Sequence, residues 1–324
     1  MVSNKNFIEF QEQIGKVKHL HRTGWVIRHV PNPETVAAHS WRMALMTIYK
    51  EKELKKLGAD IDHIIEMCLL HDVGESVVGD IVPELHQTGS EKISKEKKKH
   101  IEEEAIKFLA HKYNFPQLRA SFDEYEAQKT LESNVVKNFD KLDMLLQAYE
   151  YSLAYPNLAR LNEFMEYNEK DVDLPLFLSD IQEIKSRQFQ NKKNKNKFID
   201  SLIRAGHFKH QLHDPTGSNI SNYDTTASHL FRMAIILLYL RADSKLIKSV
   251  VAMNTDNQFI SELETLENIL QAYEYFKLYP KERPLDTYIR ENKKKITIPS
   301  LKKLLLNRKC SSAACSQRNM LKQR

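Results

Sequence analysis

Two histidines and two aspartates in the first half of the chain have the types and spacing of a metal site. His39 lies in an expected long helix, on the same face as the methionines four and seven residues further on, so its side chain should point inward. His71 and Asp72 form a doublet at the end of the next expected helix, and Asp140 lies inside a later one. An inward histidine or a His-Asp doublet means little alone. Their combination, in this order along the chain, indicates side chains that converge on one ion.

Two imidazoles and two carboxylates suit Mn²⁺, Co²⁺, Mg²⁺, Fe²⁺ or Zn²⁺ and leave coordination positions open for water and a phosphate oxygen. Such an ion can lower the pKa of water and polarise a phosphoryl group at once. The sequence offers no alternative nucleophile, since it has no GxSxG elbow, no P-loop and no HExxH motif. We therefore expect metal-assisted hydrolysis with one divalent ion, most simply manganese, cobalt or magnesium.

The elements that must position these side chains are helices. The chain has only eight glycines and few recognisable hairpin turns, which argues against a sandwich or a barrel. Apolar residues recur at helical spacing over residues 35–57, 61–70, 91–113 and 131–155, and Pro156 should end the last of these helices. The sequence predicts an all-α fold.

The chain also repeats itself. The pentapeptide Gln147–Tyr151 recurs at residues 271–275, and each copy is followed by a Tyr-Pro pair. The segment Ala38–Ala44 is echoed, in the same order, at residues 228–234. We interpret this as a tandem duplication. The expected parts are a first repeat at residues 1–185, a basic linker at 186–197, a second repeat at 198–306 and a disordered basic tail at 307–324.

The second repeat is truncated and degenerate at the positions that matter for chemistry. Alignment of the repeats places the following residues opposite the four candidate ligands: His229, Asn254, Thr255 and Glu264. Asparagine and threonine replace an imidazole and a carboxylate poorly, so we expect no metal in this repeat. The second repeat should instead dock onto the first as an intramolecular pseudo-dimer. A homodimer, or a second repeat that is only a spacer, are the alternatives.

The charge of the chain restricts its partners. The formal net charge is +6, but residues 185–198 and 301–324 together carry thirteen basic residues and no acid, which leaves −7 elsewhere. An acidic body repels phosphate backbones, so nucleic acid is an unlikely substrate. Three cysteines suit a reducing compartment, and no stretch of about 18 apolar residues is present. We expect a cytoplasmic protein without a membrane segment.

Four sequence blocks carry a family resemblance, at residues 22–28 (RTGWVIR), 33–39 (PETVAAH), 71–75 (HDVGE) and 78–81 (VGDI). In this order and spacing they resemble the HD-domain 5′-deoxynucleotidases, specifically the HD domain-containing protein 2 type and the related YfbR-like proteins. The resemblance covers roughly residues 7–155. It implies an HD-domain helical bundle that hydrolyses (deoxy)nucleoside 5′-monophosphates to nucleoside and phosphate.

The resemblance also implies roles for individual residues. One divalent ion would be held by His39, His71, Asp72 and Asp140. Glu75 would orient the attacking water or assist proton transfer, which agrees with the chemistry of a carboxylate beside an activated water. An ordinary acid at a helix terminus is the alternative interpretation of Glu75.

The substrate-binding residues implied by the resemblance are Asp80, for the deoxyribose hydroxyl or the leaving oxygen, and Trp25, near the sugar. Trp25 in the core and Asp80 as a helix-terminus acid are the alternatives. The phosphate needs a further cation, which Arg22, Arg28 or Arg42 could supply. Bacterial relatives have an arginine directly before the tryptophan, where this chain has glycine, so the choice among the three arginines stays open.

Two other functions compete with nucleotidase activity. An HD phosphohydrolase could keep the metal site and act on another nucleotide. A non-catalytic, nucleotide-binding regulatory protein could keep the fold alone. An intact set of polar residues in the first repeat favours the enzyme.

Overall fold

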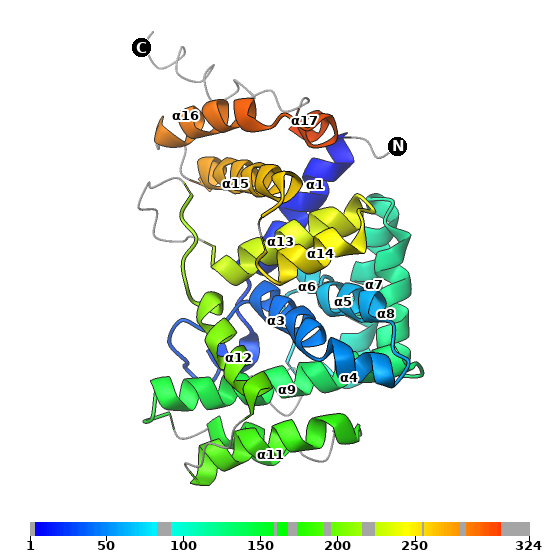
Figure 1. Ribbon diagram of the computed structural model, residues 1–324, viewed down its shortest axis with the longest axis vertical. Helices are drawn as coiled ribbons and strands as arrows, with labels where there is room; N and C mark the ends of the chain where they lie inside the picture. The colour runs from blue at the N-terminus through cyan, green and yellow to red at the C-terminus, as the bar shows by residue number, and fades with distance from the viewer. Residues whose placement is uncertain are drawn as a thin grey trace. The chain divides into compact units, whose positions relative to one another are not determined.

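The computed structural model describes residues 4–82, 92–158, 161–167, 174–190, 196–215, 224–254, 256–278 and 283–305. Within these ranges the regular elements are α-helices and short 3₁₀ helices, which confirms the all-helical prediction (Figure 1). Two isolated backbone bridges, His21–Thr35 and Leu212–Thr225, are the extended pairings found there. None of the described helices is long and apolar enough to cross a membrane.

The chain divides into two compact units. The larger comprises Gln13–Thr255, and the smaller combines Met1–Glu12 with Asp256–Arg324. This division differs from the boundaries expected from the sequence, because the larger unit holds residues 13–185 of the first repeat and the beginning of the second. The expected boundary at residues 185 and 186 falls inside helix α11 (Pro175–Gln190). The expected disordered tail, 307–324, lies outside the described residues.

The larger unit is built around helix α3. Its helices are α2 (Thr23–Val26), α3 (Val36–Tyr49), α4 (Glu51–Lys56), α5 (Ile61–Leu70), α6 (Glu75–Val78), α7 (Lys95–Lys112), α8 (Pro116–Ala127), α9 (Leu131–Ala154), α10 (Asn162–Tyr167), α11, α12 (Lys197–Gly206), α13 (Thr226–Tyr239) and α14 (Ser244–Val251). Helix α3 is buried over most of its length and packs against α5, α9, α12 and α13 (Figure 1). Helix α1 (Asn4–Gly15) begins in the smaller unit and ends in the larger.

Helices α5, α7 and α9 begin and end close to where the sequence predicts them. Helix α5 has the expected bounds, and the Asp60 side chain caps its start. Helix α9 starts with a capping box formed by Thr130 and Ser133, as a threonine at this position favours. Helix α7 starts at Lys95, after Ser94 as its N-cap. The position of Glu91, the expected start of this helix, lies outside the described residues.

One predicted helix is wrong in its extent. Residues 35–57 do not form a single helix, because the chain leaves the helical conformation at Lys50 and continues as α4. The reason is tertiary. Lys50 is buried, its ammonium lies 2.6 Å from an oxygen of Asp180, and it stands 4.2 Å from the centroid of the Phe198 ring. Such contacts override a local helical preference.

Helices α13 and α14 begin in the same way as α3 and α5. Thr35 and Thr225 each take part in an antiparallel backbone bridge, and each side chain accepts a hydrogen bond of 3.2 Å from the backbone N–H three residues on. Asp60 and Asp243 each cap the next helix by accepting from the N–H two residues on, at 3.0 and 2.9 Å. These matching starts support the predicted duplication.

The smaller unit contains α15 (Gln258–Leu278), α16 (Arg283–Asn292) and α17 (Pro299–Leu305). Helix α15 packs against the other two. The carboxylate of Glu262 on α15 accepts hydrogen bonds from the N–H and hydroxyl of Thr297 and from the N–H of Ile298, at 2.8, 2.6 and 2.7 Å. These bonds attach the segment before α17 to α15.

Candidate metal centre

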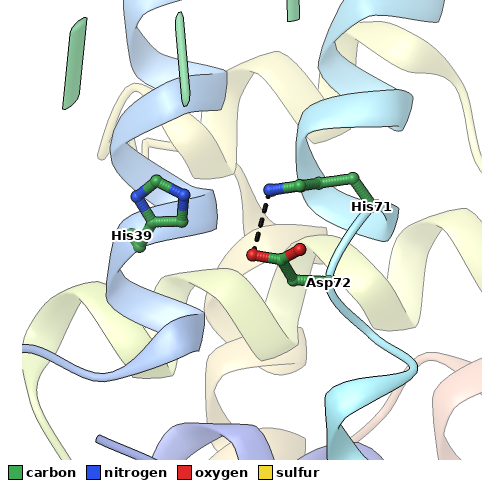
Figure 2. A group of neighbouring side chains, drawn as sticks. All are labelled: His39, His71 and Asp72. Carbon is green, nitrogen blue, oxygen red and sulfur yellow. Dashed lines mark ion pairs between the residues drawn. The ribbon is translucent and has the colours of Figure 1, made fainter. Parts of the chain in front are cut away.

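Three of the four predicted ligands form one close group, and the fourth, Asp140, adjoins His39. His39 lies on α3, His71 and Asp72 directly follow α5, and Asp140 lies on α9. Ligand atoms of His39, His71 and Asp72 lie within 4.8 Å of one another, and their side chains face the same space (Figure 2). Asp140 Oδ1 lies 3.4 Å from His39 Nε2, and Asp72 Oδ2 lies 3.1 Å from His71 Nε2.

Each imidazole is held by one nitrogen and presents the other. His39 Nδ1 lies 2.7 Å from Asp143 Oδ2, and His71 Nδ1 donates to the carbonyl of Cys68 at 2.9 Å. The Nε2 atoms of both histidines are buried and have no hydrogen-bond partner. A buried nitrogen without a partner is costly. Two of them beside two carboxylates fit a metal ion, and a second ring nitrogen held by a carboxylate or carbonyl is usual for metal-ligating histidines.

The electrostatics of the cluster favour a bound cation. Burial alone would raise the pKa of Asp140, but the adjacent His39 imidazole and nearby cations keep it well below its usual value. Burial likewise opposes ionisation of Asp72, and the adjacent His71 is the main cause that lowers its pKa. For His39, burial and the Arg22 guanidinium lower the pKa, but the carboxylates of Asp140 and its neighbour Asp143 outweigh them and raise it. The acids of the centre therefore stay ionised.

Glu75 has the properties of a group that exchanges protons. It is the first residue of α6, only 7% of it is exposed, and its Oε2 atom is buried without a hydrogen-bond partner. Burial and the neighbouring carboxylates of Asp72 and Asp80 raise its pKa well above the usual value. Gly74 allows this turn to approach α7, because a Cβ there would lie 3.2 Å from Ile106 Cγ1. A carboxyl group with a raised pKa is suited to general acid-base catalysis near neutral pH.

Of the three candidate arginines, Arg22 is the one that faces the centre. It caps α2, and its Nη2 lies 3.9 Å from Asp140 Oδ1. Its Nη1 is buried and has no hydrogen-bond partner. Burial opposes its charge, but Asp140 and other carboxylates raise its pKa above the usual value. A guanidinium with a donor to spare is suited to an anionic substrate.

The other two arginines have different contacts. Arg28 donates to the carbonyl of Gly24 at 3.0 Å, and its guanidinium lies 4.3 Å from the centroid of the Phe164 ring. Arg42 is fully buried and donates to Asp143, to Glu150 at 2.7 Å and to a glutamine. The structure therefore places neither guanidinium in the cluster of predicted ligands.

Asp80 and Trp25 are not among the closely spaced metal-capable side chains, and each has a partner of its own. Asp80 Oδ2 accepts a hydrogen bond of 2.6 Å from the backbone N–H of Thr23, which fixes the start of α2. Trp25 is 2% exposed, its indole N–H donates to Glu34 Oε1 at 3.0 Å, and its ring packs against Phe164 with centroids 4.5 Å apart. Trp25 is thus a core residue that contacts the surroundings of His39 through Glu34.

Helix α7 contributes two charged groups that sequence reasoning did not single out. Lys98 lies 3.4 Å from Glu102, and its pKa is raised: burial opposes its charge, but Glu102, Glu75, Asp72 and Asp80 favour it. Burial raises the pKa of Glu102 to about 7. Lys98 is a second cation that faces the acidic centre.

Three further residues around His39 were missed in the sequence. Glu34, His39 and Asp143 form a second group of closely spaced metal-capable side chains, but the ammonium of Lys209 already binds both carboxylates. Asp143 could have been found, since it lies three residues after Asp140 on the same helical face. Lys209 ends the segment Gly206–Lys209, which repeats the glycine and lysine of Gly15–Lys18.

Comparison with known proteins gives matches to one family over the first half of the chain. The family model of the HD domain matches residues 14–176. The 5′-deoxynucleotidase HDDC2 of Dictyostelium discoideum is 40% identical over 184 residues, which cover 54% of this chain and 94% of that protein. The human protein of the same name is 32% identical over 191 residues, 58% of this chain and 88% of that protein.

A solved structure, a conserved hypothetical protein from Pyrococcus furiosus, is 35% identical, covers 55% of this chain and 98% of that chain, and has a TM-score of 0.46. The match to the family model covers half of the chain, and the sequence blocks that carry the resemblance lie inside it. The chain therefore belongs to the HD domain family, and its similarity to the HDDC2 proteins confirms the family predicted from those blocks.

Proposed function

We propose that the chain is a metal-dependent 5′-deoxynucleotidase, which hydrolyses deoxynucleoside 5′-monophosphates to nucleoside and phosphate. The observation that carries the proposal is the pair of buried Nε2 atoms, on His39 and His71, that have no hydrogen-bond partner and face two carboxylates. The relatives named 5′-deoxynucleotidase suggest the substrate class.

The four ligands would hold one divalent ion, for which we propose manganese, cobalt or magnesium. Their donor set, two imidazole nitrogens and carboxylate oxygens, suits these ions. When bound, such an ion supplies the Lewis acidity that activates water near neutral pH and offsets the charge of the phosphoryl group.

The chain's own side chains supply proton transfer and phosphate binding. Glu75 accepts the proton of the attacking water, since its free Oε2 and its raised pKa suit this role. Arg22, whose Nη2 lies beside Asp140 and whose Nη1 has no hydrogen-bond partner, binds a phosphate oxygen, and Lys98 adds a second positive charge. Both cations counter the charge of a dianionic substrate among these acids.

Sugar selection is assigned to the α2 turn. Asp80 fixes this turn through Thr23 and keeps carboxylate oxygens for a deoxyribose hydroxyl or the leaving oxygen. The buried ring of Trp25, a residue of α2, fixes the position of this turn and thereby excludes a ribose 2′-hydroxyl. Arg28 supports the turn through its bond to Gly24 rather than binding phosphate.

We further propose that the second repeat acts as an internal partner of the first. Helix α13 packs on α3, and the side chains of Thr35 and Ser228 are hydrogen bonded at 2.8 Å. The indole N–H of Trp41 donates to the carbonyl of Val251 at 3.2 Å. These buried contacts replace the surface that a homodimer would otherwise cover.

The test is phosphate release from a panel of deoxynucleoside and nucleoside 5′-monophosphates with Mn²⁺, Co²⁺ or Mg²⁺. Wild type should favour the deoxy substrates. His71→Ala should reduce kcat/KM by at least about 10³-fold, because it removes a ligand and several kcal/mol of transition-state stabilisation.

Asn254→Ala, at the aligned position of the second repeat, is the matched control and should stay within about twofold of wild type, as a substitution remote from the chemistry does. Equal loss in both variants would contradict the assignment of the catalytic centre to the first repeat. Absence of phosphate release from any nucleotide would refute the proposed reaction.

A further inference from the structure

A lysine of the second repeat enters the surroundings of the metal centre in the first. Lys209 ends the 3₁₀ helix η5 (His207–Lys209), and its side chain is fully buried. Its Nζ lies 2.9 Å from Asp143 Oδ2 and 3.1 Å from Gln147 Oε1, and it forms an ion pair with Glu34. These three partners belong to the first repeat and are themselves buried.

The same carboxylate oxygen joins Lys209 to a predicted metal ligand. Asp143 Oδ2 accepts the hydrogen bond of Lys209 and also lies 2.7 Å from His39 Nδ1. The orientation of the His39 ring, and hence the direction of its Nε2 atom, depends on where this oxygen is held. Groups that orient a metal ligand in this way influence the affinity of the site.

Two cations fix Asp143 between them. Arg42 binds its Oδ1 atom and Lys209 its Oδ2 atom. Lys209 also bridges Asp143 to Glu34, and both carboxylates lie within 4.8 Å of a ring nitrogen of His39. Without the ammonium, two buried negative charges would repel each other beside the imidazole. The ligand ring would then lose the geometry that the centre needs.

A glycine allows the chain before Lys209 to lie close to Arg42 and Glu150. Gly206 precedes Lys209 by three residues, and a Cβ at this position would meet the carboxylate of Glu150 and lie 2.8 Å from Arg42 Nη1. The close approach is therefore built into the sequence, and α12 also packs against α3 and α9.

A reciprocal ion pair exists on the other side of the same interface. Lys18 ends the 3₁₀ helix η1 (Lys16–Lys18) of the first repeat and pairs with Asp224, which precedes the N-cap of α13. Glu34 precedes the N-cap of α3 in the same way. Both lysines and both acids have fully buried side chains. The two pairs are alike in burial and position, but Asp224 belongs to the degenerate repeat.

We propose that Lys209 is a positioning residue of the metal centre, supplied by the second repeat to hold Asp143 and thereby His39. The inference rests on the proposed function only through the identity of the metal ligands. It gives the degenerate repeat a defined task, which is to complete the surroundings of a site that it does not itself contain.

The test compares Lys209→Met with Lys18→Met in the full-length chain. Each substitution removes one buried ammonium and leaves its acidic partners, Glu34 and Asp143 for Lys209 and Asp224 for Lys18, so both should lower Tm. The readouts are the Co²⁺ dissociation constant and absorption spectrum of metal-depleted protein, together with kcat and KM. Lys209→Met should weaken Co²⁺ binding by about 10- to 100-fold, as loss of a group behind a metal ligand does, and alter the spectrum. It should also lower kcat more than it raises KM.

Lys18→Met should bind Co²⁺ as wild type does. Equal Co²⁺ affinity in the two variants, whether both weakened or both unchanged, would overturn the proposal. If Lys209→Met does not fold, Lys209→Arg should bind Co²⁺ more tightly than Lys209→Gln, and equal affinities of these two would overturn it as well. If wild type binds metal but releases no phosphate from nucleotides, the proposed nucleotidase activity is refuted. The Co²⁺ affinities of Lys209→Met and Lys18→Met would still test the role of Lys209. Absence of metal binding would refute both.

Discussion

The surroundings of His39 and those of His229 have similar helices but different side-chain contacts. Both histidines are buried at matching positions of the paired helices α3 and α13. His39 is held by Asp143 and presents Nε2 to other candidate ligands. The His229 ring instead stacks on the ring of His213, with centroids 3.8 Å apart and an interplanar angle of 27°.

The residue that stacks on His229 occupies the position of Arg22. Arg22 donates its backbone N–H to the carbonyl of Glu34 at 3.1 Å, and His213 does the same with Asp224 at 2.7 Å. At this backbone position, the Arg22 guanidinium of the first repeat lies near Asp140. In the second repeat, the His213 imidazole stacks on the His229 ring. Across the described ranges, groups of three or more metal-capable side chains occur around His39. On the predicted duplication, the second repeat keeps the helix caps and packing of the first without its set of candidate ligands.

Among substitutions that test the difference between the two repeats, we expect the largest effect on kcat at Glu75. The truncated second repeat has no counterpart of this residue. Glu75→Gln should lower kcat by about 10²- to 10⁴-fold, the usual contribution of a general acid-base group. In metal-free protein it should raise the free energy of unfolding at pH 7 by about 1 kcal/mol, a common gain when a strained functional group is replaced.

The gain is expected because the pKa of the buried carboxyl is raised in the folded state, so ionisation near neutral pH opposes folding. Steady-state kinetics and chemical denaturation measure the two effects. A variant that keeps its activity, or that loses both activity and stability, would show that Glu75 has a structural role instead.

We expect a smaller effect, on KM, that distinguishes a substitution of Arg22 from one of His213. Arg22→Met should raise KM by about 10- to 100-fold, because a hydrogen bond between charged groups contributes about 1.5–3 kcal/mol. His213→Met removes the ring at the corresponding position of the second repeat and should leave KM unchanged. Initial-rate measurements over a range of substrate concentrations decide the matter. Similar KM values for the two variants would remove Arg22 from the substrate site.

The smallest effect on activity is expected at Glu262, whose carboxylate serves folding. Hydrogen bonds from Thr297 and Ile298 lower its pKa to about 2, from an ordinary value of 4.5. A depressed carboxylate pKa stabilises the fold above pH 4.5, and the contribution is lost as the pH falls towards 2.

Glu262→Gln should therefore lower Tm at pH 7, have a diminishing effect on Tm below pH 4, and leave kcat/KM unchanged. Thermal melts of the variant and wild type between pH 3 and pH 7 test this. A difference in Tm that grows as the pH falls would contradict the assignment.

The sequence predicted the local parts of this molecule well and the non-local parts incompletely. Helix α5 and the ligand doublet after it follow from an uninterrupted apolar pattern and a capping aspartate. The break at Lys50 did not, because its cause is Asp180, far along the chain. The Lys209–Glu34 pair joins residues 175 positions apart, and no periodicity within either segment reports it.

The contacts that position His39 were missed for the same reason. Asp143 reaches it across 104 positions, and its role shows only when α3 and α9 are packed together. The types and order of the residues were enough to predict candidate metal ligands. The residues that hold those ligands, such as Asp143, could not be predicted because their contacts depend on how the helices pack. The repeat itself could have provided a partial guide, through the shared glycine and lysine before each of the two buried ion pairs.

The most direct test of the central claim is to locate the metal. Crystals of the full chain grown with Mn²⁺ or Co²⁺ should give one anomalous peak per chain, within coordination distance of His39 Nε2, His71 Nε2, Asp72 and Asp140. A peak beside His229, a peak between Glu34 and Asp143, or no peak at saturating metal would contradict the account.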